Sequence, residues 1–413
     1  MKLKLRNVIG LFIASIVFGV GISYGKVYLF HVALAAVILF YLVSRKFVIK
    51  VPTLPTRYHQ FVVLMLVWYA LSCLWSINLY YSLRYLVYII SGLSIVLIMV
   101  YYGKNLENQN FIFRIAAIIF GIEILVSLLE IASLVRWPIS PFSSYLEYFG
   151  RVSKVEFTIR ESSMYKLDTW PTGFEWNPNN LAAAISLLIP FFLFHHRFFV
   201  KIAGISISLF IIVMAGSRGV FLAVLLAFAL YFVFLNKRYY EIPFQVFIGL
   251  FFIISGIITL QYVEYWQFEE IRDTFLSLGD FISDSKSSDG SINVRKQLLQ
   301  HGVEAIKETY GVGVGGGGSV AVQERYGGIG ERHTASMHNF WLEMAVDAGI
   351  LFTLAFVIWY VSMIFKLYTI AQFHASKRLR YYASACCLGL ASFIIGSIST
   401  SSVIYFLPMW LLF

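Results

Sequence analysis

The stretch Leu83–Tyr101, LRYLVYIISGLSIVLIMVY, decides the fold class of this chain. It contains one charged residue, Arg84, and as a helix it would be about 28 Å long, which matches the roughly 30 Å hydrocarbon core of a bilayer. Similar stretches fill most of the chain, which is 59% hydrophobic and only 13% charged, about half the charged share of ordinary soluble domains. The sequence therefore predicts an all-α, polytopic membrane protein.

Outward from this stretch, the apolar runs predict about twelve transmembrane helices. They divide the chain into helices 1–5 over residues 1–134, a loop over 135–180, helices 6–9 over 181–262, a large loop over 263–339 and helices 10–12 over 340–413. The first run follows basic residues as a signal peptide does, but it lacks a small-residue cleavage site, so we expect a retained helix. The runs lie near Val8–Ser23, Val27–Val43, Phe61–Trp75, Leu83–Tyr101, Phe111–Leu134, Leu181–Phe194, Ile202–Ala215, Val220–Leu235, Pro243–Tyr262, Phe340–Phe365, Ala383–Ile398 and Val403–Phe413.

Lys and Arg residues gather in the loops on one side of this topology. By the positive-inside rule that side is cytoplasmic, which places the N-terminus in the cytoplasm and both long loops outside the cytoplasmic membrane. The net charge of +10 is explained by these loops, so we expect membrane lipids and no nucleic acid as partners. The basic clusters are Lys2/Lys4/Arg6, Arg45/Lys46/Lys50/Arg57, Lys104, Arg197/Lys201, Lys237/Arg238 and Lys377/Arg378/Arg380.

The large extracytoplasmic loop contains a helical pattern of its own over Ser291–Tyr310, with Ser291 placed as the N-cap. Leu299 and Val303 share one face of that helix with other apolar residues, which predicts an amphipathic helix lying on the membrane or roofing a cavity. Arg295 falls on the same stripe, where its planar guanidinium would suit phosphate oxygens. A salt bridge to a neighbouring carboxylate, or snorkelling, is the alternative.

Arg218 conflicts with the positive-inside rule. It lies in the tight outward turn Gly216–Gly219, directly before an apolar helix. Ser217 can cap that helix, whose N-terminus offers free N–H groups and a positive partial charge. A cation there is unfavourable unless an anion arrives, so the turn predicts a phosphate-binding site. Snorkelling to headgroups, or pairing with a loop carboxylate, is the alternative.

His338 opens the tenth predicted span, next to Asn339. An imidazole can accept a proton at neutral pH, which makes His338 a candidate base, although a lone His at a helix start is often a structural cap. Glu343 and Asp347 follow in the same span. Because buried carboxylates are costly in a membrane, they are candidates for orienting an imidazole or an arginine, or for carrying protons.

Further polar residues are predicted at the outer rim of the membrane. Asn177 and Asn179 can hold a turn or bind sugar hydroxyls, and Glu175 lies in the same segment. Arg84 begins the fourth span on the outer side and is another candidate anion contact.

Other types of site lack support in the sequence. The run Gly311–Gly318 has no Lys-Ser/Thr ending of a P-loop, so we do not expect a nucleotide there. Cys73, Cys386 and Cys387 lie in apolar stretches and are predicted to be core residues. No metal-ligand spacing or serine-hydrolase elbow occurs in the outer loops, so no metal and no cofactor is expected.

In this order, the motifs resemble the O-antigen ligase and Wzy-type polysaccharide polymerase superfamily over Gly173–Gly349. The resemblance implies a metal-independent glycosyltransferase of about twelve spans that takes a glycan from undecaprenyl diphosphate on the outer leaflet and joins it to a glycan or lipid acceptor. It assigns Arg218 and Arg295 to the diphosphate and His338 to acceptor activation. The motifs are Gly173…Asn177-Pro178-Asn179-Asn180-Leu181-Ala182, Gly216-Ser217-Arg218-Gly219 with Leu222-Ala223, Arg295, Gly311-Val312-Gly313-Val314-Gly315 and His338-Asn339…Leu342-Glu343…Gly349.

These motifs do not identify the acceptor of the glycan. The segment Asn177–Asn179 and the Ile, Phe, Tyr and Lys usage favour a cell-surface polymerase, such as those of teichuronic acid, over an O-antigen ligase that uses a lipid or protein acceptor. A transporter of lipid-linked glycans is the alternative from another class. Its charged residues would be expected along a central cavity near the midplane, whereas here they gather at the outer rim.

Overall fold

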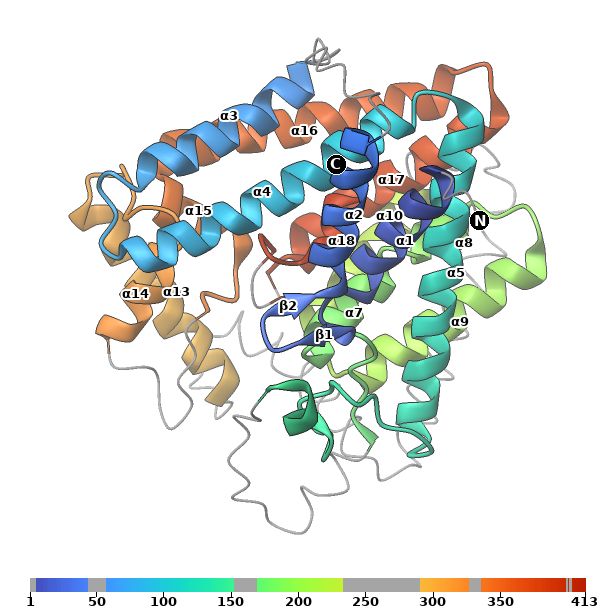
Figure 1. Cartoon of the computed structure of the whole chain (residues 1–413), viewed down its shortest axis with the longest axis horizontal. Helices are drawn as coiled ribbons and strands as arrows, with labels where there is room; N and C mark the ends of the chain where they lie inside the picture. Colours follow the sequence, from blue (N-terminus) through green and yellow to red (C-terminus); the bar gives the residue numbers. More distant parts are fainter. Residues whose placement is uncertain are drawn as a thin grey trace.

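The computed structural model describes residues 5–43, 57–151, 169–232, 290–326, 336–398, 400 and 403–413. These residues are mostly helical (Figure 1), and their one sheet pairs β1 (Ser23–Tyr24) with β2 (Val27–Tyr28) in antiparallel register, Ser23 opposite Tyr28. The all-α prediction is therefore confirmed for the described residues. The N-terminal half forms α1 (Leu5–Phe18), η1 (Gly19–Gly21), α2 (Leu29–Val43), α3 (Arg57–Ser72), α4 (Leu79–Tyr102), α5 (Leu106–Ile131), η2 (Leu146–Phe149), α7 (Pro178–Ser186) and α8 (Ile189–Leu193).

The C-terminal half continues with further helices around the same core. Four helices in the described residues, α4, α5, α16 and α17, are long and apolar enough to cross a membrane, and six shorter apolar stretches accompany them. The predicted number of about twelve spans is thus not confirmed. The elements are α9 (Phe198–Met214), α10 (Arg218–Leu230), α13 (Gly290–Glu308), α14 (Gly318–Arg325), α15 (Phe340–Ala348), α16 (Ile350–Phe373), α17 (Lys377–Gly396) and α18 (Leu407–Trp410).

The tenth predicted span, Phe340–Phe365, is divided in the structure. Gly349 ends α15 with a φ of +88°, a left-handed conformation that favours glycine. A Cβ on Gly349 would lie 2.4 Å from the carbonyl oxygen of Val312, so the glycine-rich run approaches the break closely. The short helix α15 and the long helix α16 are therefore two elements, and the residues after His338 belong to the first.

Two other predicted spans also differ. The sixth is divided into α7 and α8, with Pro190 in the first turn of α8, where its missing N–H is tolerated. The run Val403–Phe413 forms only the four-residue α18, which has Pro408 in its first turn. The ninth predicted span, 243–262, lies outside the described residues.

The helix predicted in the large loop exists as α13, and one of its faces packs against neighbouring helices. Leu298 is 1% exposed and Ala305 is 3% exposed, whereas Leu299 and Val303 are exposed. The helix packs against α14 and α15, and Ala305 and Ile306 take part in that contact. Leu299 and Val303 lie on the face that the sequence predicted to rest on the membrane or to roof a cavity, which stays a prediction. The helix begins at Gly290, so Ser291 lies within it and is not its N-cap.

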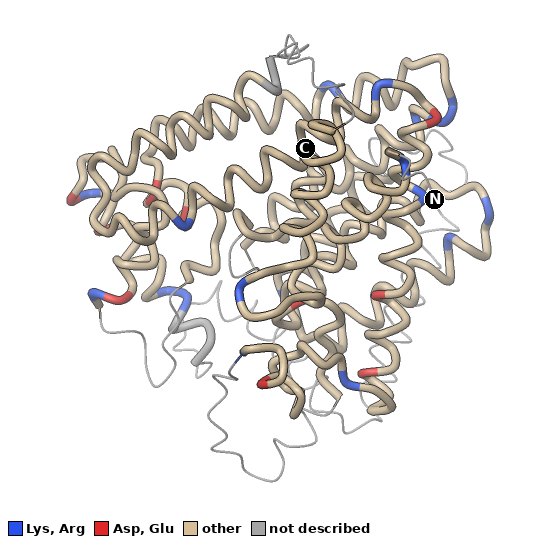
Figure 2. The backbone as a smooth tube through the Cα atoms, viewed as in Figure 1, with Lys and Arg blue, Asp and Glu red and all other residues tan. Residues whose placement is uncertain are grey.

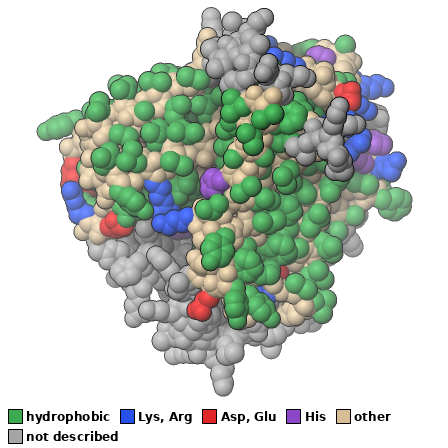
Figure 3. Space-filling model, viewed as in Figure 1, with side chains coloured by type: hydrophobic (Ala, Val, Ile, Leu, Met, Phe, Trp, Pro, Cys, Tyr) green, Lys and Arg blue, Asp and Glu red, His purple; other side chains and the backbone are tan. Residues whose placement is uncertain are grey.

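Apolar packing dominates the bundle inside and outside. Helix α17 packs against α8, α10 and α16, α1 packs against α2 and α5, and α3 packs against α4. Figure 3 shows hydrophobic side chains over most of one outer face, with charged side chains mainly toward its edges. An apolar exterior on an apolar core is typical of a protein surrounded by lipid.

Candidate functional site

A cavity of about 480 Å³ opens at the end of the bundle where α1 ends and where α4 and α7 begin. Four of its lining residues come from α4, and others come from the hairpin, from the segment before α7 and from the segment before α15. Four residues singled out in the sequence, Arg84, Glu175, Asn177 and His338, are brought together here. The lining residues are Gly19, Val20, Tyr28, Tyr81, Arg84, Tyr85, Tyr88, Arg151, Glu175, Trp176, Asn177, Asn180, Val320, Ser336, His338, Tyr405, Phe406, Leu407 and Pro408.

His338 holds an unusual backbone conformation beside this cavity. Its φ is +47°, which is uncommon for a residue with a side chain. Its backbone N–H donates to Ser336 Oγ (3.3 Å), and the next residue, Asn339, caps α15 by accepting from the N–H groups of Trp341 and Leu342. Strained backbone of this kind gathers at functional sites, where the surrounding structure holds it in place.

The imidazole of His338 is neutral at physiological pH. Burial lowers its pKa, and the positive charge of Arg295 lowers it further, to about 4. The ring Nδ1 is buried and has no hydrogen-bond partner among the described residues. No carboxylate in the described part of the chain therefore accepts a hydrogen bond from Nδ1, and the orienting role considered for Glu343 and Asp347 stays a prediction.

Those two carboxylates have other partners. Glu343 is 2% exposed and accepts a hydrogen bond from Tyr85 Oη at 2.8 Å. Asp347 accepts from the backbone N–H groups of Gly317 (2.9 Å) and Ser319 (2.7 Å). Asp347 thus holds the glycine-rich run at the start of α14, and Glu343 holds the wall of the cavity through Tyr85.

The two predicted diphosphate ligands lie outside the lining residues. Arg295 is an exposed residue of α13, close enough to His338 for its charge to act on the imidazole. Arg218 is the first residue of α10 and is partly buried. Ser217 occupies the N-cap position of that helix, but its side chain makes no capping hydrogen bond, contrary to prediction.

Of the two roles left open for Asn177 and Asn179, the structure shows only the holding of a turn, and sugar binding stays a prediction. Asn177 caps α7 by accepting from the N–H of Asn180 at 2.9 Å, and it also lines the cavity. Asn179 is a partly exposed residue of α7 outside the lining set, and Asn339 serves as the N-cap of α15. The turn-holding role is thus observed for Asn177 and Asn339.

Glu175 is a buried acid in the cavity wall. It is 6% exposed, and its Oε1 has no hydrogen-bond partner among the described residues. Burial raises the pKa of Glu175 to about 8, so the group is mostly protonated at neutral pH. Glu123, fully buried on α5, lies close enough to interact electrostatically with it. A protonated acid facing a cavity can donate a hydrogen bond without adding negative charge.

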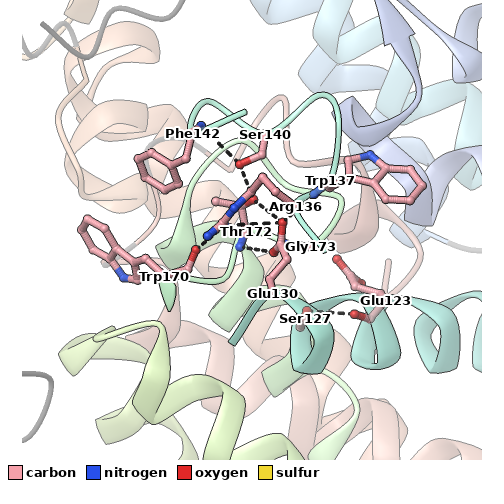
Figure 4. Close-up of polar contacts among 10 residues, drawn as sticks. All are labelled: Glu123, Ser127, Glu130, Arg136, Trp137, Ser140, Phe142, Trp170, Thr172 and Gly173. Atoms are coloured by element: carbon pink, nitrogen blue, oxygen red, sulfur yellow. Dashed lines mark hydrogen bonds and ion pairs between the residues drawn. The ribbon is translucent and has the colours of Figure 1, made fainter. Parts of the chain in front are cut away.

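The segments that carry Glu175 and Asn177 are held by one carboxylate at the end of α5. Glu130 accepts from the N–H groups of Thr172 (2.7 Å) and Gly173 (2.8 Å) with Oε2 and from that of Trp137 (3.0 Å) with Oε1, and Arg136 lies 3.5 Å from Oε1 (Figure 4). The indole of Trp137 donates in turn to the carbonyl of Gly21 at 2.7 Å. These bonds connect the loop after α5, the segment before α7 and η1, and so hold together one side of the cavity wall.

The cavity lies at the opposite end of the helices from the basic clusters. Arg6 pairs with Glu107 at 3.5 Å, and the hydroxyl of Tyr382 donates to Asn110 at 2.8 Å, which brings the starts of α1, α5 and α17 together. Several Lys and Arg positions lie around these helix starts, at the upper right of the view in Figure 2. Helix α1 runs from this end to Gly19 in the cavity wall, and α4 runs from the cavity back to Tyr102.

Comparison with known proteins agrees with the family resemblance predicted from the sequence. The family model described as O-antigen ligase matches residues 203–357, the segment that contains Arg218, Arg295 and His338. The teichuronic acid biosynthesis protein TuaE of Bacillus subtilis (strain 168) is 22% identical over 343 residues, which cover 80% of this chain and 65% of that protein. The predicted resemblance to the O-antigen ligase and Wzy-type superfamily is confirmed.

The segment matched by the O-antigen ligase family supplies only part of the cavity wall. Val320, Ser336 and His338 come from it, whereas Arg84 and Arg151 come from before it. Arg151 was missed in the sequence, as were the aromatic residues around it. An arginine in a loop rich in aromatics was the available signal, but only the fold brings that loop against the hairpin and α4.

No metal site is evident in the described ranges, where no three His, Cys, Asp or Glu side chains gather in a way that could hold an ion. Because this statement covers only the described residues, the expectation of a metal-independent O-antigen ligase-type reaction stays a prediction.

Proposed function

We propose that this protein is a membrane glycosyltransferase that transfers a glycan from a polyprenyl diphosphate to a sugar hydroxyl, in one inverting displacement and without a metal. The observation that carries the proposal is the position of His338: a neutral imidazole, within electrostatic reach of Arg295, in the wall of a cavity inside a chain of the O-antigen ligase superfamily.

The reaction balances with the residues present. A neutral imidazole at His338 takes the proton from the acceptor hydroxyl as its oxygen attacks the anomeric carbon of the donor. The bond from that carbon to the diphosphate oxygen breaks, and the leaving diphosphate gains negative charge. Arg218 and Arg295 stabilise that charge, since guanidinium groups match phosphate oxygens in geometry and sign.

The site faces outward in this proposal. The basic clusters at the starts of α1, α5 and α17 mark the cytoplasmic end under the positive-inside rule, and the cavity lies at the other end of those helices. A lipid-linked donor on the outer leaflet of the cytoplasmic membrane would reach it there. A transporter is less well supported, because its site would be expected near the midplane.

We favour a polymerase over a ligase. The relative TuaE is a teichuronic acid biosynthesis protein, and a polymerase uses the same lipid-linked repeat as donor and acceptor. A ligase, the activity in the name of the matching family, would require a separate lipid or protein acceptor.

The test uses purified protein in lipid nanodiscs with polyprenyl-diphosphate repeat units as the sole glycan, followed by separation of products by length. A ladder of longer chains is expected from the wild-type protein and not from His338→Ala. Products that form only after a lipid or protein acceptor is added would identify a ligase. Failure to form products with any acceptor, while the protein moves the lipid across vesicles, would overturn the proposal in favour of transport.

A further inference from the structure

Two arginines in the cavity wall are not used by the proposed chemistry. Arg84 lies in the second turn of α4 and Arg151 follows η2, and both line the cavity that contains His338. Neither guanidinium forms an ion pair with a carboxylate in the described part of the chain, and both donate hydrogen bonds to hydroxyl groups there. Arg84 Nε donates to Tyr88 Oη at 2.6 Å, and Arg151 Nη2 donates to Ser23 Oγ at 3.0 Å.

Aromatic rings hold both guanidinium groups. Arg151 lies 4.9 Å from the centroid of Trp176 and 5.6 Å from that of Tyr28, and Arg84 lies 5.6 Å from that of Tyr88. A guanidinium held beside aromatic rings keeps N–H groups available for a planar acceptor. In Arg84 the Nε already donates to Tyr88, which leaves the two terminal nitrogens. The Nε of Arg151 is buried without a hydrogen-bond partner among the described residues, which leaves a donor to be satisfied.

The remaining ionisable groups of the wall do not neutralise these charges. Glu175 is mostly protonated at neutral pH, since burial raises its pKa to about 8, and His338 is neutral with a pKa of about 4. The described lining residues therefore carry two positive charges and no full negative charge at neutral pH. A cavity of this kind attracts an anion and holds it more strongly than open solvent would.

We propose that Arg84 and Arg151 bind an oxyanion carried by the glycan itself, so that the substrate of this enzyme contains an acidic sugar. This inference rests on the proposed function. A carboxylate on a sugar ring fits the surroundings, because its planar group matches the guanidinium edge while the ring packs against Tyr28, Tyr88 and Trp176. The diphosphate of the carrier lipid is the other source of an oxyanion, and the test separates the two.

The probes are methyl glycosides of glucuronic, galacturonic and mannuronic acid, each compared with its neutral hexose counterpart, and inorganic pyrophosphate. Binding to the full-length protein in nanodiscs is followed by ligand-observed NMR at neutral pH. At least one uronide is expected to bind about tenfold or more tightly than its neutral counterpart, and Arg84→Gln or Arg151→Gln is expected to remove that preference. Arg197→Gln, an exposed arginine outside the cavity, serves as the matched control and should retain it.

Other outcomes would overturn the inference. A wild-type protein that prefers no uronide over its neutral counterpart contains no acidic-sugar subsite. Pyrophosphate binding that is lost in Arg84→Gln and Arg151→Gln, without a uronide preference, would assign the pair to the lipid diphosphate. Size-exclusion chromatography checks folding, and Arg84→Lys or Arg151→Lys replaces any Gln variant that fails to fold. A lysine keeps the positive charge but loses the two-pronged guanidinium, so we expect a reduced preference for the uronide over the neutral sugar.

Because the assay needs no donor and no turnover, its failure is distinguishable from failure of the proposed function. Chain elongation without uronide binding would remove the subsite alone. Uronide binding without elongation would leave an acidic-glycan site in a protein with another role.

Discussion

Arg295, on the exposed side of α13, acts electrostatically on His338 at the start of the segment that leads into α15, and its charge, after burial, is the second cause of the low pKa of that imidazole. The two residues belong to separate elements that meet because α13 packs on α15. An anion bound by Arg295 would offset its charge and so raise the basicity of the imidazole when the donor is present.

The pH dependence of kcat/KM tests this relationship. With a pKa of about 4 in the free enzyme, His338 stays neutral down to that pH, so its protonation should reduce kcat/KM only as pH approaches 4, rather than near the ordinary value of 6.5. Arg295→Gln removes the neighbouring charge and should shift this decline to higher pH, while Arg295→Lys should not. An unchanged profile in Arg295→Gln would show that burial alone sets the pKa.

His338→Ala should retain binding of the lipid-linked donor and lose turnover. A positioned base contributes about 10²–10⁴-fold in rate, and kcat should fall by that amount. The measurement is chain elongation with saturating donor, with and without EDTA, which is expected to change nothing in the wild-type protein. Near-normal elongation by the variant would reduce His338 to a structural residue, and a loss on chelation that a divalent ion restores would show that a metal takes part.

Glu175 should make the protein less stable as pH rises. Its pKa is raised from 4.5 to about 8, so the folded state binds more protons than the unfolded state between these values. The stabilisation is fully present below about 4.5 and is lost as pH rises through 8. Glu175→Gln should flatten the decline of the thermal midpoint between pH 5 and 9, a difference on the order of a few kcal/mol. The exposed Glu147→Gln is the control; equal slopes in both variants would contradict the prediction.

Gly349→Ala should damage the junction between α15 and α16. Its φ of +88° is strained for alanine, and the added Cβ would lie 2.4 Å from the carbonyl oxygen of Val312. We expect destabilisation of about 1–3 kcal/mol or more, seen as a lower thermal midpoint. Gly121→Ala is the matched control, because nothing lies within 4 Å of a Cβ at that position. Equal thermal midpoints for the two variants would show that the backbone of Val312 moves away from the added Cβ at little cost in stability.

The orientation can be measured by labelling with a membrane-impermeant thiol reagent in a background where Cys73, Cys386 and Cys387 are replaced by serine. Tyr148→Cys, at a position that is 78% exposed in η2, should react from outside intact cells. Ala375→Cys, exposed in the turn before α17, should react only after the membrane is opened. The reverse pattern would place the cavity in the cytoplasm and overturn the proposed donor.

The sequence was sufficient for the helical class and for the resemblance to the O-antigen ligase superfamily. Hydropathy predicts the helices because it follows burial in lipid, whereas the roles of the motif residues stay predictions. The sequence failed where a neighbouring element decides the result. Gly349 breaks a continuous apolar run at the point where the backbone of Val312 approaches it closely.

The cavity itself could not be predicted, since its wall combines segments far apart in the chain. Arg84 was singled out because it was predicted at the start of a span. Arg151 could not be singled out in the same way, because only the fold places its guanidinium beside Tyr28, in the same cavity wall. Glu175 was noted as a rim carboxylate, whereas its burial depends on Glu130 fixing the turn before it. Such long-range contacts leave no periodic pattern in the sequence.

The spread of the cavity wall from Gly19 to Pro408 also has a consequence for biosynthesis. While the chain is still being inserted by the translocation machinery, the first helices can occupy the bilayer for many seconds before α15 and α18 emerge from the ribosome. Until Tyr405–Pro408 arrive, one side of the cavity is missing. A nascent or prematurely ended chain therefore has an incomplete cavity wall, and the cavity is completed only at the end of translation.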